Sequence, residues 1–216
     1  MEAGSSWVRL PPKHLIQALE RRVRQDGGLV AANEITTGFG RTGKWFGYEH
    51  YCLQPDIVAV GKILGNGYPV SAVVMKEPVA VNLERENFRY AQSHQNDALG
   101  CAVAMEVIKT IREAGLIQRS NEVGHIFKEK LVELQRQHEC IREVRGLGLM
   151  LAIELQNIEL AAIHRELFNR GYLVGVSPVA NLLRFFPSLT ISIEDIDGMI
   201  YALNDVLFGH IGMNPK

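Results

Sequence analysis

The sequence predicts an α/β protein: a mostly parallel sheet with helices, followed by a smaller α+β domain. Two short apolar runs, residues 29–32 and 57–60, lack alternation of polar and apolar residues, as expected of strands covered on both faces. Helix-like and strand-like segments alternate in the first half, whereas the second half mixes helices with short strands and shows no such runs. We therefore predict two domains, at residues 1–112 and 113–216.

The elements of the first half follow from the residues at their ends. Pro11 and Pro12 precede a helix-like stretch that Gly27 and Gly28 terminate. Proline favours helix starts and glycine favours helix ends, which predicts a helix to about residue 26. The elements predicted after it are strands at residues 29–32, 56–61 and 70–75 and a long helix at residues 97–114.

The second half begins with a predicted helix at residues 120–138. Ser192 is followed by acidic residues, which is an N-cap signal for a final helix to about residue 208. The elements between them are strands at residues 145–155 and 181–186 and a helix at residues 159–170. Only three strands are visible in the first domain, and a buried parallel strand needs neighbours on both sides. We therefore expect the carboxyl-terminal part of a larger protein, or one of two chains.

Composition excludes several classes of partner. The net charge is −1, and the densest basic cluster, Arg21, Arg22 and Arg24, falls on the first predicted helix, so we expect a solvated helix face and no nucleic-acid partner. The three cysteines lack metal-ligand spacing, which predicts reduced thiols and no metal. No apolar run in the sequence reaches membrane-spanning length. A cytoplasmic protein without a membrane partner is expected.

Chemically useful side chains follow the two apolar runs. Asn33 comes after the first and Lys62 after the second. Ligands of parallel sheets bind beyond the carboxyl ends of the strands. An amine enclosed by apolar strands loses its proton more easily, because burial disfavours the charged form, and a free amine can form a Schiff base. Alternatively, Lys62 is a solvated loop lysine.

Two motifs support a family resemblance. Residues 33–43 read Asn-Glu-Ile-Thr-Thr-Gly-Phe-Gly-Arg-Thr-Gly, and residues 61–69 read Gly-Lys-Ile-Leu-Gly-Asn-Gly-Tyr-Pro. In this order and separation they resemble the class III (omega-type) aminotransferases of the fold-type I enzymes, and the resemblance continues through residues 93–101, 144–155 and 183–196. It implies part of the fold-type I large domain, a small carboxyl-terminal domain and pyridoxal 5'-phosphate (PLP) as cofactor.

The resemblance gives Lys62 and Asn33 roles. Lys62 matches the Schiff-base lysine, which anchors the cofactor and moves the proton as general base. Asn33 stands where the family has an aspartate that keeps the ring nitrogen protonated. Loss of that charge is worth roughly 2.7 kcal/mol, about a hundredfold in rate, although an amide can still hydrogen-bond a neutral ring nitrogen. Alternatively, Asn33 is a turn residue that ends a strand.

Four further positions match the family's binding residues. Ile35 matches the branched residue that packs on the cofactor ring, and Thr36 replaces a glutamine that hydrogen-bonds the ring hydroxyl. Ser93 aligns with the threonine that reaches the cofactor phosphate across a dimer interface; alternatively it is a loop residue before a helix. Arg184 matches the arginine that holds the substrate carboxylate; alternatively it forms an ion pair within its domain.

Other positions carry no catalytic expectation. Glu34 resembles the family's second acid and receives no catalytic role, and Arg41 is expected to fix a loop. The turn Gly4-Ser5-Ser6-Trp7 lacks the glutamate that switches the substrate arginine off in dual-specificity members. Family members are about twice as long, and the phosphate cup and stacking aromatic residue of their amino-terminal half do not occur in this sequence.

The resemblance implies a homodimeric aminotransferase that moves an amino group between an amino acid or amine and a 2-oxo acid. The chain is expected to be a truncated or split form that binds PLP weakly or not at all by itself. A racemase, epimerase or aminomutase of the same family is the alternative that Asn33 suits. A non-catalytic fragment that acts only in association with another chain is the other alternative.

Overall fold

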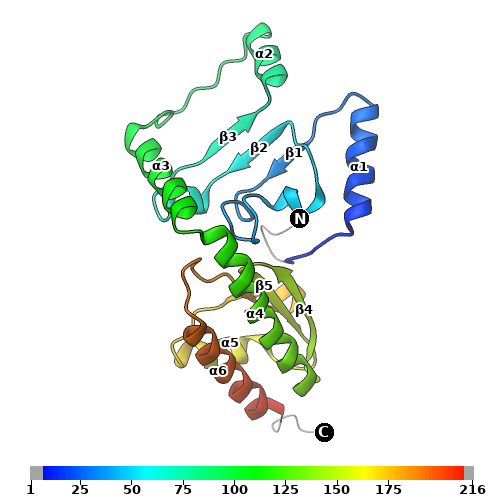
Figure 1. Ribbon diagram of the computed structural model, residues 1–216. Coiled ribbons are helices and arrows are strands. Elements are labelled where there is room, and N and C mark those ends of the chain that lie inside the picture. Colours follow the sequence, from blue (N-terminus) through cyan, green and yellow to red (C-terminus); the bar gives the residue numbers. More distant parts are fainter. Residues whose placement is uncertain (1–6, 212–216) are drawn as a thin grey trace. The chain divides into compact units, whose positions relative to one another are not determined.

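The computed structural model describes residues 7–211 (Figure 1). The chain forms two compact units. The amino-side unit consists of Pro11–Phe39 and Lys44–Gly115; the carboxyl-side unit consists of residues 7–10, Gly40–Gly43 and residues 116–211. The chain passes from the amino-side unit to the carboxyl-side unit for the last time after residue 115, next to the boundary expected from the sequence. The assignment of domains remains a prediction.

The amino-side unit contains a three-stranded sheet and three α-helices. Its elements are α1 (Lys13–Gln25), β1 (Ala31–Asn33), β2 (Ile57–Val60), β3 (Ala72–Met75), α2 (Glu77–Arg85) and α3 (Ala98–Glu113), with the 3₁₀ helices η1 (Gly47–Tyr51) and η2 (Lys62–Gly65). The first and last helices and the three strands lie where the sequence predicts them. Helix α2 was not predicted.

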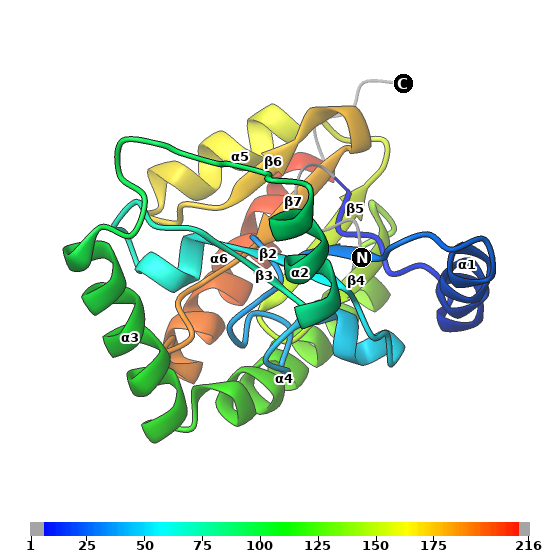
Figure 2. The same ribbon diagram turned by 90° about the horizontal axis from the view of Figure 1, so that it is seen from above.

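The sheet has the order β1-β2-β3 and is mixed. Strands β1 and β2 are parallel, with Asn33 opposite Ala59, whereas β2 and β3 are antiparallel, with Ile57 opposite Met75. The carboxyl ends of β1 and β2 therefore meet at one edge of the sheet, as the sequence analysis assumed. Figures 1 and 2 agree that α1 and α3 lie at opposite ends of this sheet.

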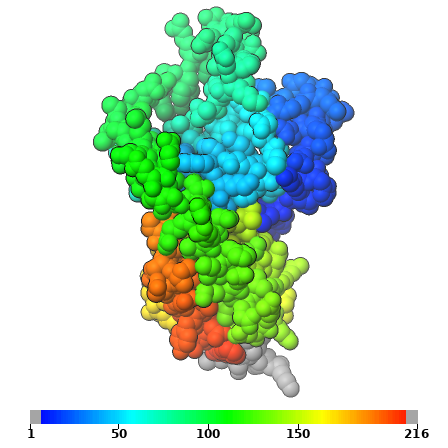
Figure 3. Space-filling model, in the orientation of Figure 1, coloured from blue at the N-terminus to red at the C-terminus, as the bar shows by residue number. Residues whose placement is uncertain are grey.

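The run at residues 29–32 is not covered on both faces, so that expectation was wrong for this run, in which Leu29 is 58% exposed. The run at residues 57–60 is partly buried and ends at the buried Val60. Val73 and Val74 point to opposite faces of β3, yet they are 60% and 59% exposed. The apolar side chains of α1 are also exposed. In Figure 3 the cyan atoms of this unit are open to view between α1 in blue and α3 in green. Because the helices lie at the ends of the sheet, β1 and β3 have little cover within the described residues, whereas β2 between them is at least partly buried.

A buried carboxylate joins the segments around β2. Asp56 accepts hydrogen bonds from the Val30 backbone N–H at 2.9 Å, from Lys76 Nζ at 3.1 Å and from Arg24 Nη1 at 3.1 Å. These bonds connect α1 and the start of β1 to the segment after β3. The bond from Val30, helped by those from Lys76 and Arg24, lowers the pKa of Asp56 to about 2 although burial opposes the shift.

The carboxyl-side unit has an antiparallel sheet in the order β4-β5-β7-β6. Its elements are α4 (Leu116–Gln137), β4 (Ile141–Leu147), β5 (Met150–Leu155), α5 (Leu160–Asn169), β6 (Gly175–Ser177), the 3₁₀ helix η3 (Pro178–Ala180), β7 (Leu182–Phe185) and α6 (Ile193–Ile211). Helix α4 starts four residues before the predicted helix. The predicted strand at residues 145–155 is instead a hairpin, because Gly148 adopts φ +54° and turns the chain between β4 and β5.

This unit buries a core on both faces of β5. On one face Leu151 lies opposite Phe185 of β7, whose ring packs edge-on against Phe127 of α4 with centroids 5.5 Å apart. On the other face Met150 and Ala152 pack with Val8, and all three are fully buried. At about 25 cal/mol per Å² of buried apolar surface, this packing stabilises the carboxyl-side unit. Among the described residues, no helix has the length and apolarity needed to cross a membrane.

Glycine is required where α4 meets the hairpin turn. A Cβ on Gly124 would lie 2.2 Å from the backbone oxygen of Gly148. Gly148 in turn touches the backbone of Thr42 and Gly43, where an added Cβ would come within 2.6 Å. Backbone atoms cannot move aside as the end of a flexible side chain can. The spacing between α4, the hairpin turn and the segment at Thr42 and Gly43 is therefore fixed.

The variant Asp56→Asn tests the carboxylate at β2. The pKa of Asp56 lies below its ordinary 3.8 in the folded chain, so its ionised form stabilises the fold above about pH 4 and this contribution is lost as the pH falls toward 2. We expect Asp56→Asn to lower the free energy of unfolding at pH 7 by roughly 1–3 kcal/mol and to flatten its decline between pH 4 and pH 2. Denaturant titrations across this range measure both effects. The exposed position Asp26 provides the control variant, Asp26→Asn. If the free energy of unfolding falls equally with pH in Asp56→Asn and wild type, the assignment is contradicted.

The variant Gly124→Ala tests the close approach of α4 to the hairpin. The added methyl has to displace backbone, so we expect a loss of about 1–3 kcal/mol in the free energy of unfolding. Gly209→Ala in α6 is the matched control, because nothing lies within 4 Å of its added Cβ, and alanine in a helix is favoured by up to about 1 kcal/mol over glycine. Equal stability of the two variants would show that the packing is looser than described.

Candidate active site

The candidate site is built on a buried carboxylate at the end of β1. Glu34 is 3% exposed. Its carboxylate accepts hydrogen bonds from the backbone N–H groups of Gly47 and Tyr48, both at 2.8 Å, and from Thr37 Oγ1 at 2.5 Å. A buried charge is tolerated when it is hydrogen-bonded in this way. Glu34 thus fixes the turn after β1 against the start of η1.

The same turn places Thr36 beside Lys62. Gly38 N–H donates to the Glu34 carbonyl at 3.0 Å, which closes the turn around Thr36. Lys62 follows β2 and donates from Nζ to Thr36 Oγ1 at 2.8 Å. The parallel pairing of β1 with β2 brings these two residues to one edge of the sheet, so two of the predicted site residues are in direct contact.

Lys62 itself is exposed and its backbone is unusual. Its φ of +48° is left-handed, a conformation that costs a non-glycine residue about 1–3 kcal/mol and is often found at functional sites. The sequence analysis expected apolar strands to enclose the amine. Instead Lys62 is exposed, because neither face of the sheet is fully covered within the described residues.

Asn33 and Ile35 lie next to this pair. Asn33 is exposed, and its Oδ1 accepts a hydrogen bond from the Ile35 backbone N–H at 3.2 Å. This is the local bond of a turn residue, and it leaves the amide Nδ2 as the group available to a ligand. Ile35 is half-buried, and a Cβ built on Gly61 would lie 3.8 Å from its Cγ2. Ile35 therefore lies against the segment that leads into Lys62.

Ser93 lies in an exposed turn before α3. Helix α3 is capped by Asp97, whose carboxylate accepts from Gly100 N–H at 2.7 Å and from Tyr68 Oη at 3.2 Å. The bond from Tyr68 connects the start of α3 to the loop that follows Lys62. Ser93 is not needed for this cap, and the structure gives it no contact with Lys62 or Thr36.

Arg184 and Arg41 belong to the carboxyl-side unit. Arg184 on β7 is half-buried and donates from Nη2 to the Val176 carbonyl of β6 at 2.9 Å. Arg41 Nη1 donates to the carbonyls of Leu149 and Pro187 at 3.1 and 2.5 Å, and burial lowers its pKa to about 10. Arg41 therefore fixes a loop, as expected. The switch position in Gly4-Ser5-Ser6 lies outside the described residues.

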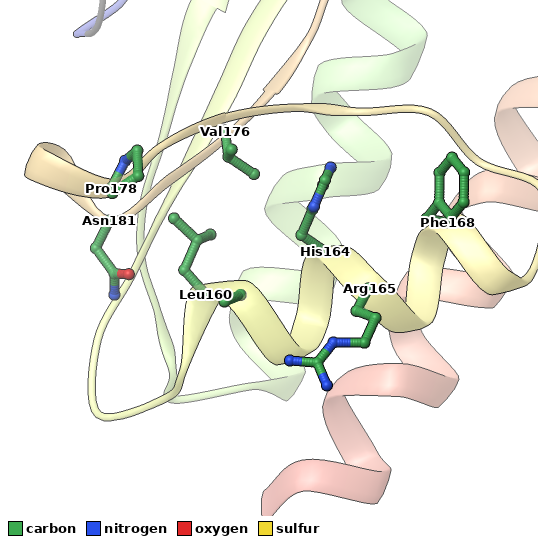
Figure 4. A pocket seen from close by; sticks show the side chains of 8 residues that line it. Leu160, His164, Arg165, Phe168, Val176, Pro178 and Asn181 are labelled. Atoms are coloured by element: carbon green, nitrogen blue, oxygen red, sulfur yellow. The ribbon is translucent and has the colours of Figure 1, made fainter.

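A separate hollow of about 590 Å³ lies in the carboxyl-side unit between α5 and the segment around η3 (Figure 4). Its wall is mainly apolar, with Leu160, Phe168 and Val176, and His164 points toward it from α5. None of the residues predicted for the site lines it. Within residues 7–211 no group of three His, Cys, Asp or Glu side chains is placed to hold a metal ion. The chemistry expected from the motifs therefore rests on the Lys62 edge.

Glu34 is the site residue whose importance the sequence analysis missed. A glutamate after a short strand gives no sign of burial by itself, because glutamate is usually exposed. The sequence signal for this buried carboxylate was Thr37, three residues later in Glu34-Ile35-Thr36-Thr37. A hydroxyl at this spacing can hydrogen-bond to the carboxylate. The two other donors come from residues 47 and 48, which no local pattern connects to residue 34.

Comparison with known proteins identifies the family of the chain. The pattern of the family described as "Aminotransferase class-III" matches residues 3–207. The chain belongs to the class III aminotransferase family. This family depends on PLP. The α/β fold also matches a solved S-selective transaminase from Bacillus megaterium with a TM-score of 0.89 at 27% identity, covering 96% of this chain and 48% of that one.

Curated relatives of this class III family chain have different activities. It is 35% identical to an acetylornithine aminotransferase of Caldanaerobacter subterraneus subsp. tengcongensis over 94% of this chain and 51% of the relative. It is 32% identical to a leucine/methionine racemase of Thermococcus litoralis over 97% of this chain and 49% of the relative. The chain thus spans about half the length of the curated relatives it matches.

The variant Glu34→Ala tests the base of the site. Its loss leaves two backbone N–H groups and a hydroxyl without their buried acceptor, each at a cost of about 1–3 kcal/mol. We expect the free energy of unfolding of the amino-side unit to fall by roughly 3 kcal/mol or more, as measured by denaturant titration. The matched control is Glu84→Ala, an exposed position on α2, which should change stability by less than about 0.5 kcal/mol. A loss in Glu34→Ala no larger than in this control would contradict the described bonds.

Proposed function

We propose that this chain supplies the lysine-bearing part of a PLP-dependent aminotransferase, which moves an amino group between an amino acid or amine and a 2-oxo acid. The observation that carries the proposal is the position of Lys62. Its amine is exposed at the edge where β1 and β2 end, and it is held by Thr36. An accessible amine at a defined point is the requirement for a covalent anchor that also acts as general base.

The groups at this edge fit PLP at its aldehyde and ring end. Lys62 offers an amine, Asn33 an amide donor and Ile35 an apolar side chain, all within one short stretch of two neighbouring strands. When bound, PLP would supply an electron sink for the carbon that carries the amino group. Lys62 would anchor it and move the proton, Asn33 would hydrogen-bond the ring nitrogen, and Ile35 would pack on the ring.

Two further residues complete the proposed roles. Ser93 would donate its hydroxyl to the cofactor phosphate, and Arg184 would bind the substrate carboxylate through its planar guanidinium. We extend the proposal to a homodimer in the cytoplasm with small-molecule amino donors and 2-oxo acid acceptors. No role is proposed for a metal, a nucleic acid or a membrane.

A second activity is favoured by Asn33. Its Oδ1 is engaged by the backbone of Ile35, so the amide presents a neutral donor where the family's aspartate would present a charge. A weaker electron sink suits a racemase, epimerase or aminomutase more than a fast aminotransferase, and one relative is named as a racemase. Exchange of the substrate α-proton with deuterated water, without formation of a 2-oxo acid, would favour this activity over transamination.

The exposed sheet motivates a third possibility, a non-catalytic fragment that acts only in association with another chain. Val73 and Val74 on β3 leave apolar surface exposed on both faces, which is unusual for a sheet that works alone. Such a fragment would show no PLP absorbance by itself or with any upstream half of a class III enzyme. A band that appears only after co-expression with that half would favour a split enzyme.

Addition of PLP to the purified chain, alone and together with an upstream half of a class III enzyme, tests the role of Lys62. By itself the chain should bind PLP weakly or not at all, so the expected result refers to the two parts together. We expect an absorption band in the visible range that weakens at least tenfold in Lys62→Ala, since imine formation requires the amine. Borohydride should abolish this band and leave the cofactor covalently attached to Lys62, because hydride reduces the C=N bond to a stable secondary amine. Lys44→Ala is the matched control, because Lys44 is an exposed lysine of the same unit outside the proposed machinery. An equal band in Lys62→Ala and wild type would refute the assignment of the anchor.

A further inference from the structure

The side chain of Lys62 is constrained at both of its ends. At its base, the left-handed backbone is held by the turn of η2, in which Asn66 N–H donates to the Lys62 carbonyl at 3.2 Å. At its tip, Nζ donates to Thr36 Oγ1 at 2.8 Å. A lysine side chain has four rotatable bonds, so fixing both ends selects a few of its many rotamers.

The partner of Lys62 differs in kind from those of most other described lysines, although Lys13 donates to the thiol of Cys52 at 3.0 Å. Lys76 and Lys130 pair with carboxylates, and Lys44 and Lys128 donate to backbone carbonyls. Carboxylates and carbonyls only accept hydrogen bonds. They can accept from an ammonium group, but they have no proton to donate to the lone pair of a neutral amine. A hydroxyl accepts from the ammonium and can donate to the neutral amine. The partner of Lys62 can therefore hold both protonation states.

The hydroxyl of Thr36 is itself at a fixed point. Thr36 is half-buried in the turn that Gly38 N–H closes on the Glu34 carbonyl at 3.0 Å. The carboxylate of Glu34 anchors this turn through bonds from Gly47 and Tyr48. A hydroxyl on a flexible loop would move together with the lysine. The hydroxyl of Thr36 is instead fixed at the end of β1, so it holds the amine at that position.

We propose that Thr36 is a positioning residue for Lys62, whose amine it holds at the strand edge in both the protonated and the neutral form. This inference rests on the proposed function, in which Lys62 has to gain and lose a proton without leaving the site. It assigns Thr36 a contact with the lysine, in place of the contact with the cofactor ring hydroxyl that the family resemblance implied.

Two variants separate the hydroxyl from the shape of the side chain. Thr36→Val keeps the shape and removes the hydroxyl, and Thr36→Ser keeps the hydroxyl. Each purified chain is treated with PLP and then with borohydride. The lysine amine condenses with the aldehyde and releases water, and hydride then reduces the C=N bond to a stable secondary amine. Peptide mass spectrometry gives the labelling of Lys62 relative to the exposed Lys44, and circular dichroism verifies folding.

We expect the ratio of Lys62 to Lys44 labelling to fall about fivefold in Thr36→Val, the loss that one hydrogen bond implies, and to stay within about twofold of wild type in Thr36→Ser. A wild-type ratio in Thr36→Val, with Lys62 still labelled in excess of Lys44, would overturn the positioning role and leave the proposed function intact. An equal fall in Thr36→Ser would also overturn it. Labelling of Lys62 no stronger than Lys44 in the wild-type chain, both alone and together with an upstream half of a class III enzyme, would instead overturn the proposed function.

Discussion

The buried carboxylate of Glu34 is the constraint on which the candidate site depends. It satisfies two backbone N–H groups and one hydroxyl inside the amino-side unit, and so it holds the turn after β1 in one conformation. Thr36 stands on that turn and contacts Lys62. An ionised group in the interior is costly unless its partners are complete, which makes the three donors and the turn a single unit that forms or fails together.

The two compact units obtain their stability in different ways. In the carboxyl-side unit, apolar residues cover β5 on both faces, so the hydrophobic effect acts as in an ordinary domain core. In the amino-side unit the strands are largely exposed, and charged hydrogen bonds at Asp56 and Glu34 hold the segments together. Such bonds define geometry well but add little net stability each.

Local signals in the sequence predicted most elements of the fold. Proline, glycine and capping residues located α1 and α6, and the two apolar runs placed Asn33 and Lys62 at the carboxyl ends of neighbouring strands, which the structure pairs in parallel. The contact between Lys62 and Thr36 was not predicted. The coverage of β1 was predicted incorrectly, because an apolar run indicates what a strand prefers and not whether a partner surface is present. The hairpin at Gly148 was missed, since one glycine in an apolar stretch does not distinguish a turn from a continuous strand. Two of the three donors to Glu34, the backbone N–H groups of Gly47 and Tyr48, are distant in sequence and left no local trace.

Hydrogen exchange of the Gly47 and Tyr48 amides, resolved by NMR, tests the central claim most directly, namely that a buried Glu34 carboxylate holds the site in place. Both amides donate to this carboxylate, so the account predicts protection that matches the most protected amides of the amino-side sheet and that disappears when Glu34 is replaced by alanine. Exchange of both amides in the wild-type chain at the rate of an open loop would contradict the account.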